Sequence, residues 1–294
     1  MSASVLSAGA HAFTTAHGAT ITYFVTGNGP LVVLNVAPGW GPASVLYQNT
    51  FGFLEHDFTF VHIEPRGTRG SSFPPDLREM SSWRMAEDVE AVRQHLGIDV
   101  LEGVMGHSNG GTIALWHAIR FSGTTKTLVL VDAKARGLAS ISDPVTREML
   151  AARPDRDAVD AFARWNPDNY DTDDEMAALM GSFLQLYLAR PERDLAALQA
   201  GFDTKPQIAC AKHQFAAEYQ HDNQVPHLEN VTARTLLIVG RQDFICPVVV
   251  SEFAAQRIPD ASLVVIEDSG HMPFLEQPTQ FGDAVRKFYN IAAR

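Results

Sequence analysis

Ser108 lies in the segment Gly106-His107-Ser108-Asn109-Gly110, which matches the G-x-S-x-G pattern of a serine nucleophile. An apolar run at 101–105 predicts a buried strand before it, and residues 112–119 predict a helix after it. A serine on such a turn is pushed out above the sheet, and glycines are needed where the strand and helix backbones pass closely. A Gly-rich turn that only caps a helix would carry the same pattern, so partners elsewhere in the chain must decide between the two interpretations.

A serine hydroxyl attacks only when a histidine removes its proton and a carboxylate orients that histidine. Asp243 and His271 each follow an apolar run that is typical of a buried strand. Both are therefore expected on loops at the carboxyl ends of strands, in the chain order serine, acid, histidine. Asp268 is a weaker alternative for the acid. We predict Ser108, Asp243 and His271 as the catalytic residues.

Further residues are expected around these three. Negative charge that develops on a substrate oxygen needs hydrogen-bond donors, and we predict the backbone N–H groups of Asn109 and Ala37 for that role. His107, the variable position of the pattern, is expected to point away from the site. Residues beside the catalytic loops are predicted to line an apolar pocket, with ordinary core packing as the alternative: Trp40, Phe244, Ile245 and Met272.

The elements that must position these residues alternate along the chain. Residues 11–26 predict a hairpin. Continuous apolar runs predict buried strands at 31–36, 58–63, 101–105, 127–131, 235–239 and 262–266. Apolar residues at helical spacing predict helices within 82–97 and 275–292. Alternating strands and helices predict an α/β fold, with a mostly parallel central sheet and helices on both faces.

Residues 135–230 interrupt this alternation, because they contain only helical segments punctuated by prolines. These segments are predicted at about 143–152, 156–165, 173–189, 191–201 and 206–219. We predict a core formed by 1–134 and 231–294, with 135–230 inserted as a helical lid, or cap. Ligands of open α/β sheets bind at the carboxyl edge of the strands, so the lid is expected to cover that edge.

Composition narrows the function classes. The 294 residues are 46% hydrophobic, and the formal net charge of −11 argues against nucleic acid or an anionic membrane as a partner. The sequence contains no run of 18 apolar residues and no secretory pattern, so a cytoplasmic protein is expected. The expected partner is a small-molecule substrate, and a homodimer is left open.

The two cysteines, Cys210 and Cys246, do not make a disulfide framework, and both are expected to be reduced. The sequence has neither the H-E-x-x-H nor the C-x-x-C pattern of a metal site. No cofactor and no metal are therefore expected.

These segments resemble the α/β-hydrolase superfamily, and in particular its proline iminopeptidase-like branch, over roughly residues 20–135 and 230–292. The H-G-G-P-G loop of that branch corresponds to Asn35–Gly39, which keeps the Pro-Gly pair but lacks the His-Gly pair. Its D-x-R-G-x-G-x-S landmark corresponds to Glu64–Ser72, which keeps the Arg-Gly core. Asn109 stands where the peptidases carry an aromatic residue. Epoxide hydrolases and haloalkane dehalogenases have a similar fold, but they carry an aspartate at the position that corresponds to Ser108.

The resemblance and the three predicted residues favour a serine hydrolase that forms an acyl-enzyme with a small, hydrophobic ester, lactone or thioester. One alternative is a proline iminopeptidase-like aminopeptidase. Another is a non-hydrolytic catalyst or a small-ligand receptor on the same fold, because a fold does not fix a function.

Overall fold

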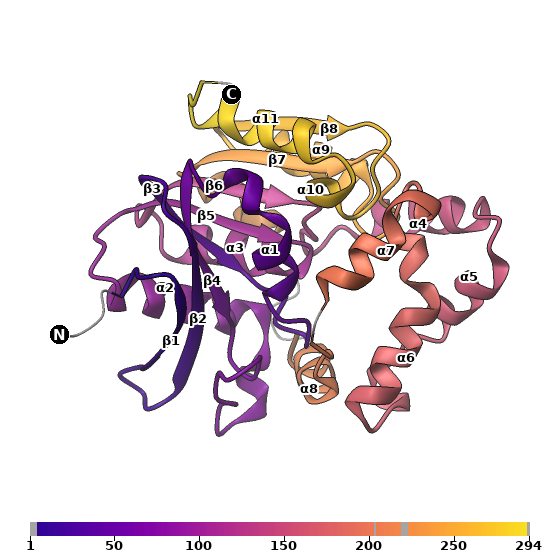
Figure 1. Cartoon of the computed structure of the whole chain (residues 1–294), viewed down its shortest axis with the longest axis horizontal. Coiled ribbons are helices and arrows are strands. Elements are labelled where there is room, and N and C mark those ends of the chain that lie inside the picture. Colours follow the sequence, from indigo (N-terminus) through magenta and orange to yellow (C-terminus); the bar gives the residue numbers. More distant parts are fainter. Residues whose placement is uncertain (1–4, 203, 219–222, 293–294) are drawn as a thin grey trace.

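The computed structural model describes residues 5–202, 204–218 and 223–292. The predicted core and lid ranges also include residues outside this description, at both ends and at 203 and 219–222. One eight-stranded sheet forms the centre, in the order β1-β2-β4-β3-β5-β6-β7-β8 (Figure 1). The strands are β1 (Gly9–Thr14), β2 (Thr20–Gly27), β3 (Leu31–Val36), β4 (Phe58–Glu64), β5 (Leu101–His107), β6 (Thr125–Val131), β7 (Arg234–Gly240) and β8 (Ala261–Ile266).

Strand β2 pairs antiparallel with β1 and with β4, and every other neighbouring pair in the described sheet is parallel. The predicted mostly parallel sheet is thus confirmed. Parallel strands all end at the same edge, so the loops that follow β3, β5, β6, β7 and β8 gather at one rim.

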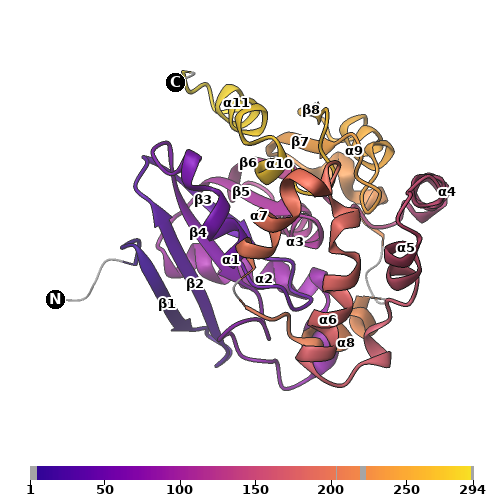
Figure 2. The same ribbon diagram turned by 45° about the vertical axis from the view of Figure 1, so that its right-hand side comes forward.

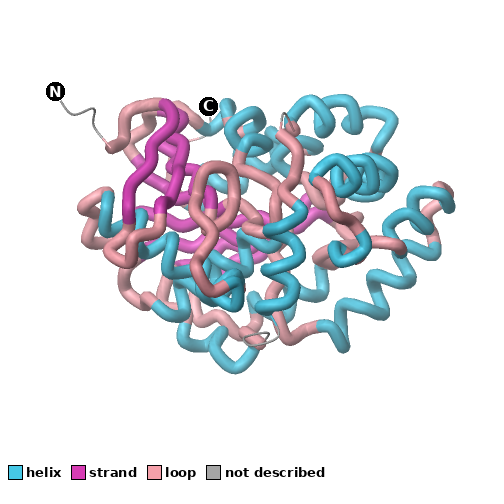
Figure 3. Tube along the Cα trace, turned by 90° about the horizontal axis from the view of Figure 1, so that it is seen from below, coloured by secondary structure: helices cyan, strands magenta, loops and turns pink. Residues whose placement is uncertain are grey.

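Helices cover both faces of the sheet, as Figure 3 shows by colour. Alternate strand residues point to opposite faces, and they enter separate cores. Leu34 packs in one core with α2 (Ser82–His95), α3 (Asn109–Arg120) and α9 (Val248–Ala255). Its neighbour Val33 packs in the other core with α1 (Val45–Thr50), α10 (Pro273–Glu276) and α11 (Pro278–Phe288).

The described part of the segment between β6 and β7 is helical, and its helices lie to one side of the sheet (Figure 2). They are α4 (Ala139–Ala151), α5 (Arg156–Ala163), α6 (Asp173–Phe183), α7 (Pro191–Gly201) and α8 (Ile208–Glu218), with the short 3-10 helices η3 (Pro167–Asn169), η4 (Leu184–Tyr187) and η5 (Val225–Asn230). Met176, Phe183 and Ile208 join the core residue Phe244 in a small hydrophobic cluster that anchors this segment to the loop after β7.

Helix α6 ends at Phe183, whereas the sequence predicts a helical segment over about 173–189. The chain continues as η4, and the carbonyl of Tyr187 accepts a hydrogen bond from the His271 N–H at 2.6 Å. A continuing helix would direct that carbonyl along its own axis, and Pro191 also disfavours helical backbone in the residue before it. Tertiary contact therefore overrides the local pattern.

Within the part of the chain that the structure describes, no helix combines the length and the apolar character needed to cross a bilayer. Cys210 and Cys246 are both buried free thiols.

Candidate active site

Ser108 joins β5 to α3 with a φ of 56° and a ψ of −125°, a backbone conformation that side chains rarely adopt. The glycines on either side make this turn feasible. A Cβ on Gly106 would stand 2.2 Å from the carbonyl oxygen of Gly110, and a Cβ on Gly110 would stand 2.2 Å from the carbonyl oxygen of Val36. Strand, helix and the neighbouring strand thus hold Ser108 at the rim of the sheet.

Asp243 and His271 meet on the loops that follow β7 and β8. The Nδ1–H of His271 donates to Asp243 Oδ2 at 2.8 Å, and both side chains are buried. The other carboxylate oxygen accepts from the N–H groups of Ile245, at 2.8 Å, and Cys246, at 3.2 Å. Burial alone would raise the pKa of Asp243, but the neighbouring His271 holds it below its usual value. The carboxylate thus orients the imidazole through Nδ1, and the Nε2 of His271 remains available to accept a proton.

Glu276 of α10 holds the loop that carries His271. One of its carboxylate oxygens accepts from the N–H groups of Gly270, at 2.8 Å, and Met272, at 3.2 Å. The other accepts from the N–H of Ala189, at 2.7 Å, in the inserted segment. Glu276 therefore fixes the histidine loop and the insertion to each other.

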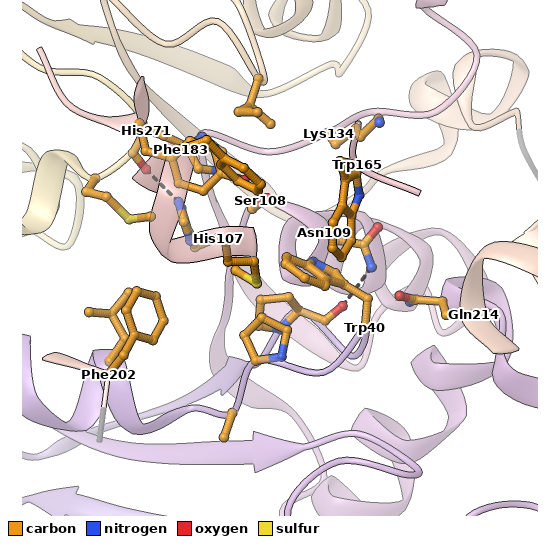
Figure 4. Close-up of a pocket in the computed structure, with 18 of the residues that line it drawn as sticks. Trp40, His107, Ser108, Asn109, Lys134, Trp165, Phe183, Phe202, Gln214 and His271 are labelled. Carbon is orange, nitrogen blue, oxygen red and sulfur yellow. Dashed lines mark hydrogen bonds between the residues drawn. The ribbon is translucent and has the colours of Figure 1, made fainter. Parts of the chain in front are cut away.

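Ser108 and His271 line the same cavity, of about 220 Å³ (Figure 4). Within the described residues the Ser108 hydroxyl and the His271 Nε2 make no hydrogen bond, and catalytic hydrogen bonds often tighten only when substrate binds. Aromatic side chains make up much of the wall: Trp40, Tyr47, Phe162, Trp165, Phe183, Tyr187, Phe202 and Phe215. A small, largely apolar substrate would fit such a cavity.

Three of the four predicted pocket residues, Trp40, Ile245 and Met272, line this cavity. Phe244 does not belong to its wall, and that prediction is wrong. The Phe244 ring is fully buried against Phe162 and Tyr187. Because successive residues of the loop point in different directions, Ile245 faces the cavity while Phe244 anchors the insertion.

The two predicted oxyanion donors differ. Asn109 is the first residue of α3. Its N–H donates to no described residue, so it is available to bind an oxyanion. The N–H of Ala37 donates to the Ile63 carbonyl at 3.1 Å as an extension of the β3–β4 ladder. The prediction that the Ala37 N–H binds the oxyanion is therefore wrong, because this N–H is already bonded to β4. The Trp40 N–H, further along the same loop, donates to no described residue.

The Asn109 side chain ties the elbow to this loop. Its Nδ2 donates to the Pro38 carbonyl at 2.7 Å and to Ser82 Oγ at 3.2 Å, and its Oδ1 accepts from Arg136 at 3.1 Å. The aromatic residue of the peptidases could not make these bonds.

His107 lines the cavity, so the prediction that it points away is wrong. Its Nδ1 accepts from the Tyr47 hydroxyl at 3.0 Å, and its Nε2–H donates to the His271 carbonyl at 2.7 Å. Burial lowers the pKa of His107 to about 3, which keeps the ring neutral. Sequence carries no signal for this role, since it depends on a loop more than 160 residues away.

Asp132 follows β6 and adopts a φ of 41°. Its Oδ1 accepts from the Gly240 N–H at 2.8 Å. Burial and the nearby Asp243 carboxylate raise the pKa of Asp132 well above its usual value. The opposite pKa shifts of the two carboxyl groups favour negative charge on Asp243, the one bonded to His271.

Asp243, Cys246 and His271 offer potential metal-ligand atoms within 4.8 Å of one another. The Asp243 carboxylate already accepts the hydrogen bond from His271 Nδ1. A thiol, an imidazole and a carboxylate could hold zinc, but only if this bond were broken.

Comparisons with known proteins identify the family to which this fold belongs. The family model described as alpha/beta hydrolase fold matches residues 30–278. "Proline iminopeptidase PfmaB" of Pestalotiopsis fici is 23% identical over 269 residues, covering 90% of this chain and 94% of that protein. A "Pimeloyl-[acyl-carrier protein] methyl ester esterase" of Vibrio atlanticus is 25% identical, covering 89% and 95%.

Among solved structures, an alpha/beta fold family hydrolase from Bacillus anthracis has a TM-score of 0.76 at 22% identity and covers 95% of this chain and 98% of its own. A thermophilic esterase from Thermogutta terrifontis has a TM-score of 0.71 at 23% identity, covering 96% and 98%. The chain therefore belongs to the α/β-hydrolase superfamily of enzymes, with relatives in its proline iminopeptidase-like branch.

Proposed function

We propose that this enzyme is a serine hydrolase that cleaves a small, largely apolar ester, lactone or thioester through an acyl-enzyme on Ser108. One observation carries the proposal: His271, bonded to Asp243 at 2.8 Å, lines one cavity with a serine held in a strained turn. The inserted helices at 135–230 serve as the lid, because Phe162, Trp165 and Phe183 of this segment form part of the cavity wall.

In the first half of the reaction, His271 Nε2 takes the proton of the Ser108 hydroxyl while the oxygen attacks the substrate carbonyl carbon. Asp243 stabilises the imidazolium that forms. The N–H of Asn109 donates to the oxyanion, and we assign the second donor to the N–H of Trp40 in place of Ala37. His271 then gives its proton to the leaving group, and a water molecule activated by the same imidazole releases the acid.

The test is covalent labelling with a fluorophosphonate, followed by ester hydrolysis with purified variants. Wild-type protein should gain one adduct on Ser108, and Ser108→Ala should lose the label and about 10⁴-fold or more of its turnover. Ester cleavage that persists undiminished in Ser108→Ala would contradict the proposal.

An aminopeptidase is the second candidate, because several relatives carry the name proline iminopeptidase. Such a substrate presents a protonated amine, which needs an acidic partner. The described cavity wall contains Lys134 and Arg136 but no Asp or Glu, so its charge opposes an ammonium group. A panel of aminoacyl anilides decides the matter: cleavage would support the peptidase, and no cleavage at high enzyme concentration would remove it.

A further inference from the structure

Lys134 is a cation at the wall of the catalytic cavity that the proposed mechanism does not use. It follows β6, and its backbone is fixed to the nucleophile elbow. The Lys134 N–H donates to the Ser108 carbonyl at 3.2 Å, and its own carbonyl accepts from the Thr112 hydroxyl. Hydrogen bonds of both its N–H and its carbonyl thus hold the Lys134 backbone beside Ser108.

The Lys134 ammonium makes no ion pair or hydrogen bond within the described residues, although the side chain is accessible to solvent. Lys134 lines the cavity that Ser108 and His271 also line, and burial and the nearby Arg136 lower the pKa of its ammonium. The positive charge of Lys134 is therefore not balanced by a bonded anion among the described residues, and a second cation, Arg136, lies near it.

Arg136 lies two residues further on in the same wall. Its guanidinium donates to Asn109 at 3.1 Å and lies 3.6 Å from the Glu218 carboxylate, while its buried Nε has no hydrogen-bond partner among the described residues. Glu218 thus offsets one of the two positive charges. The remaining single charge suits a carboxylate better than a phosphate dianion.

We infer that Lys134, with Arg136 beside it, binds a carboxylate of the substrate, so that the preferred substrates are small esters that carry one free carboxylate group. This inference rests on the proposed function and names its substrate class. The aromatic wall would pack against the carbon chain, the ester carbonyl would reach Ser108, and the free carboxylate would accept hydrogen bonds from the ammonium. A protein with a net charge of −11 otherwise repels such an anion, so local cations are needed to hold it.

The test compares half-esters with neutral esters of the same shape. Monomethyl succinate, glutarate and adipate are assayed beside the esters in which a carboxamide replaces the free carboxylate. Wild-type enzyme should show a higher kcat/KM for the half-ester at one or more chain lengths. The ratio of the two kcat/KM values should fall about 10- to 100-fold in Lys134→Met, the range expected for a charge-assisted hydrogen bond, and largely persist in Lys134→Arg.

Lys126→Met is the matched control, because it removes the same charge at the opposite end of β6, where Lys126 pairs with Glu102 on the surface. Its ratio should equal that of wild-type enzyme. A second measurement needs no variant: glutarate should inhibit hydrolysis of a neutral ester more strongly than glutaramide, and added salt should weaken the difference.

A wild-type ratio near one at every chain length, or a ratio that Lys134→Met leaves unchanged, would overturn the inference. Equal inhibition by glutarate and glutaramide would overturn it as well, even if Lys134→Met does not fold. In each case Ser108-dependent hydrolysis of the neutral esters would still stand. If hydrolysis instead survives Ser108→Ala, the proposed function itself fails.

Discussion

The ring of His107 lies against the ring of His271, with centroids 4.6 Å apart, and the His107 Nε2–H donates to the His271 carbonyl at 2.7 Å. The Tyr47 hydroxyl donates to the other ring nitrogen, so a neutral His107 has both nitrogens satisfied. A neutral ring also places no second positive charge beside the imidazolium that His271 would form. His107, the residue before Ser108, thus positions the proposed base His271 and does not compete with it for a proton.

His107→Asn should therefore lower kcat more than it changes KM. We expect a loss of about 10- to 100-fold, because small displacements of a catalytic group can cost that much. Steady-state hydrolysis and the rate of fluorophosphonate labelling both report it. Tyr47→Phe removes only one hydroxyl and should give a smaller loss in the same direction. His17→Asn, at an exposed histidine, serves as the control. An unchanged labelling rate in folded His107→Asn would contradict this role.

The two neighbouring aspartates should respond differently to the same substitution. Asp243→Asn should lower kcat by about 10⁴-fold, because an amide cannot stabilise the imidazolium and favours the wrong tautomer. Burial and the Asp243 carboxylate raise the pKa of Asp132 and so favour its neutral form, which an asparagine matches in shape and charge. Asp132→Asn should therefore keep activity within about tenfold of wild type. Comparable losses in the two variants would show that Asp132 is ionised.

Two buried histidines should make the fold sensitive to acid. Burial lowers the pKa of both His62 and His107 to about 3, whereas an unfolded histidine titrates near 6.5. Between about pH 3 and pH 6.5 these two histidines bind protons in the unfolded chain but not in the folded chain. The free energy of unfolding should therefore fall as pH falls from about 6.5 to 3, by on the order of a few kcal/mol for each histidine.

Glu64 acts with the opposite sign, because burial raises its pKa to about 7. Its folded form keeps a proton that the unfolded form loses, so its contribution is lost as pH rises from about 4.5 to 7. The steepest loss on acidification is thus expected below about pH 4.5. Urea unfolding at several pH values measures the slope. His62→Gln should be less stable overall but show a shallower acid slope, and an identical slope would refute the assignment.

The nucleophile elbow should tolerate no side chain at Gly106. Gly106→Ala should destabilise the fold by about 3 kcal/mol or more, since the new Cβ would meet the Gly110 carbonyl oxygen at 2.2 Å. Gly181→Ala is the control, because a Cβ there meets nothing within 4 Å on an exposed helix position. It should stabilise α6 by up to about 1 kcal/mol. Thermal or urea unfolding compares the two, and equal stabilities would contradict the packing argument.

Local patterns in the chain are enough to predict the sheet, because continuous apolar runs indicate buried strands and glycines indicate the tight turn between strand and helix. It also predicted Ser108, Asp243 and His271, since residues that follow parallel strands must emerge at one rim. Local pattern failed where a residue's partner is distant in the chain. The segment at 184–187 leaves the predicted helix, and its Tyr187 carbonyl accepts from the His271 N–H.

Which of the residues beside the catalytic loops face the cavity depends on how the folded chain packs. Phe244 and Ile245 are both apolar and adjacent, yet Phe244 packs against the segment between β6 and β7 and Ile245 lines the cavity. The sequence position of Ala37 suits an oxyanion donor, but in the folded chain its N–H already donates to the Ile63 carbonyl of β4. The neutral state of His107 and the unmatched charge of Lys134 likewise depend on what is packed around them, because desolvation and nearby charge act through space and leave no mark on sequence spacing.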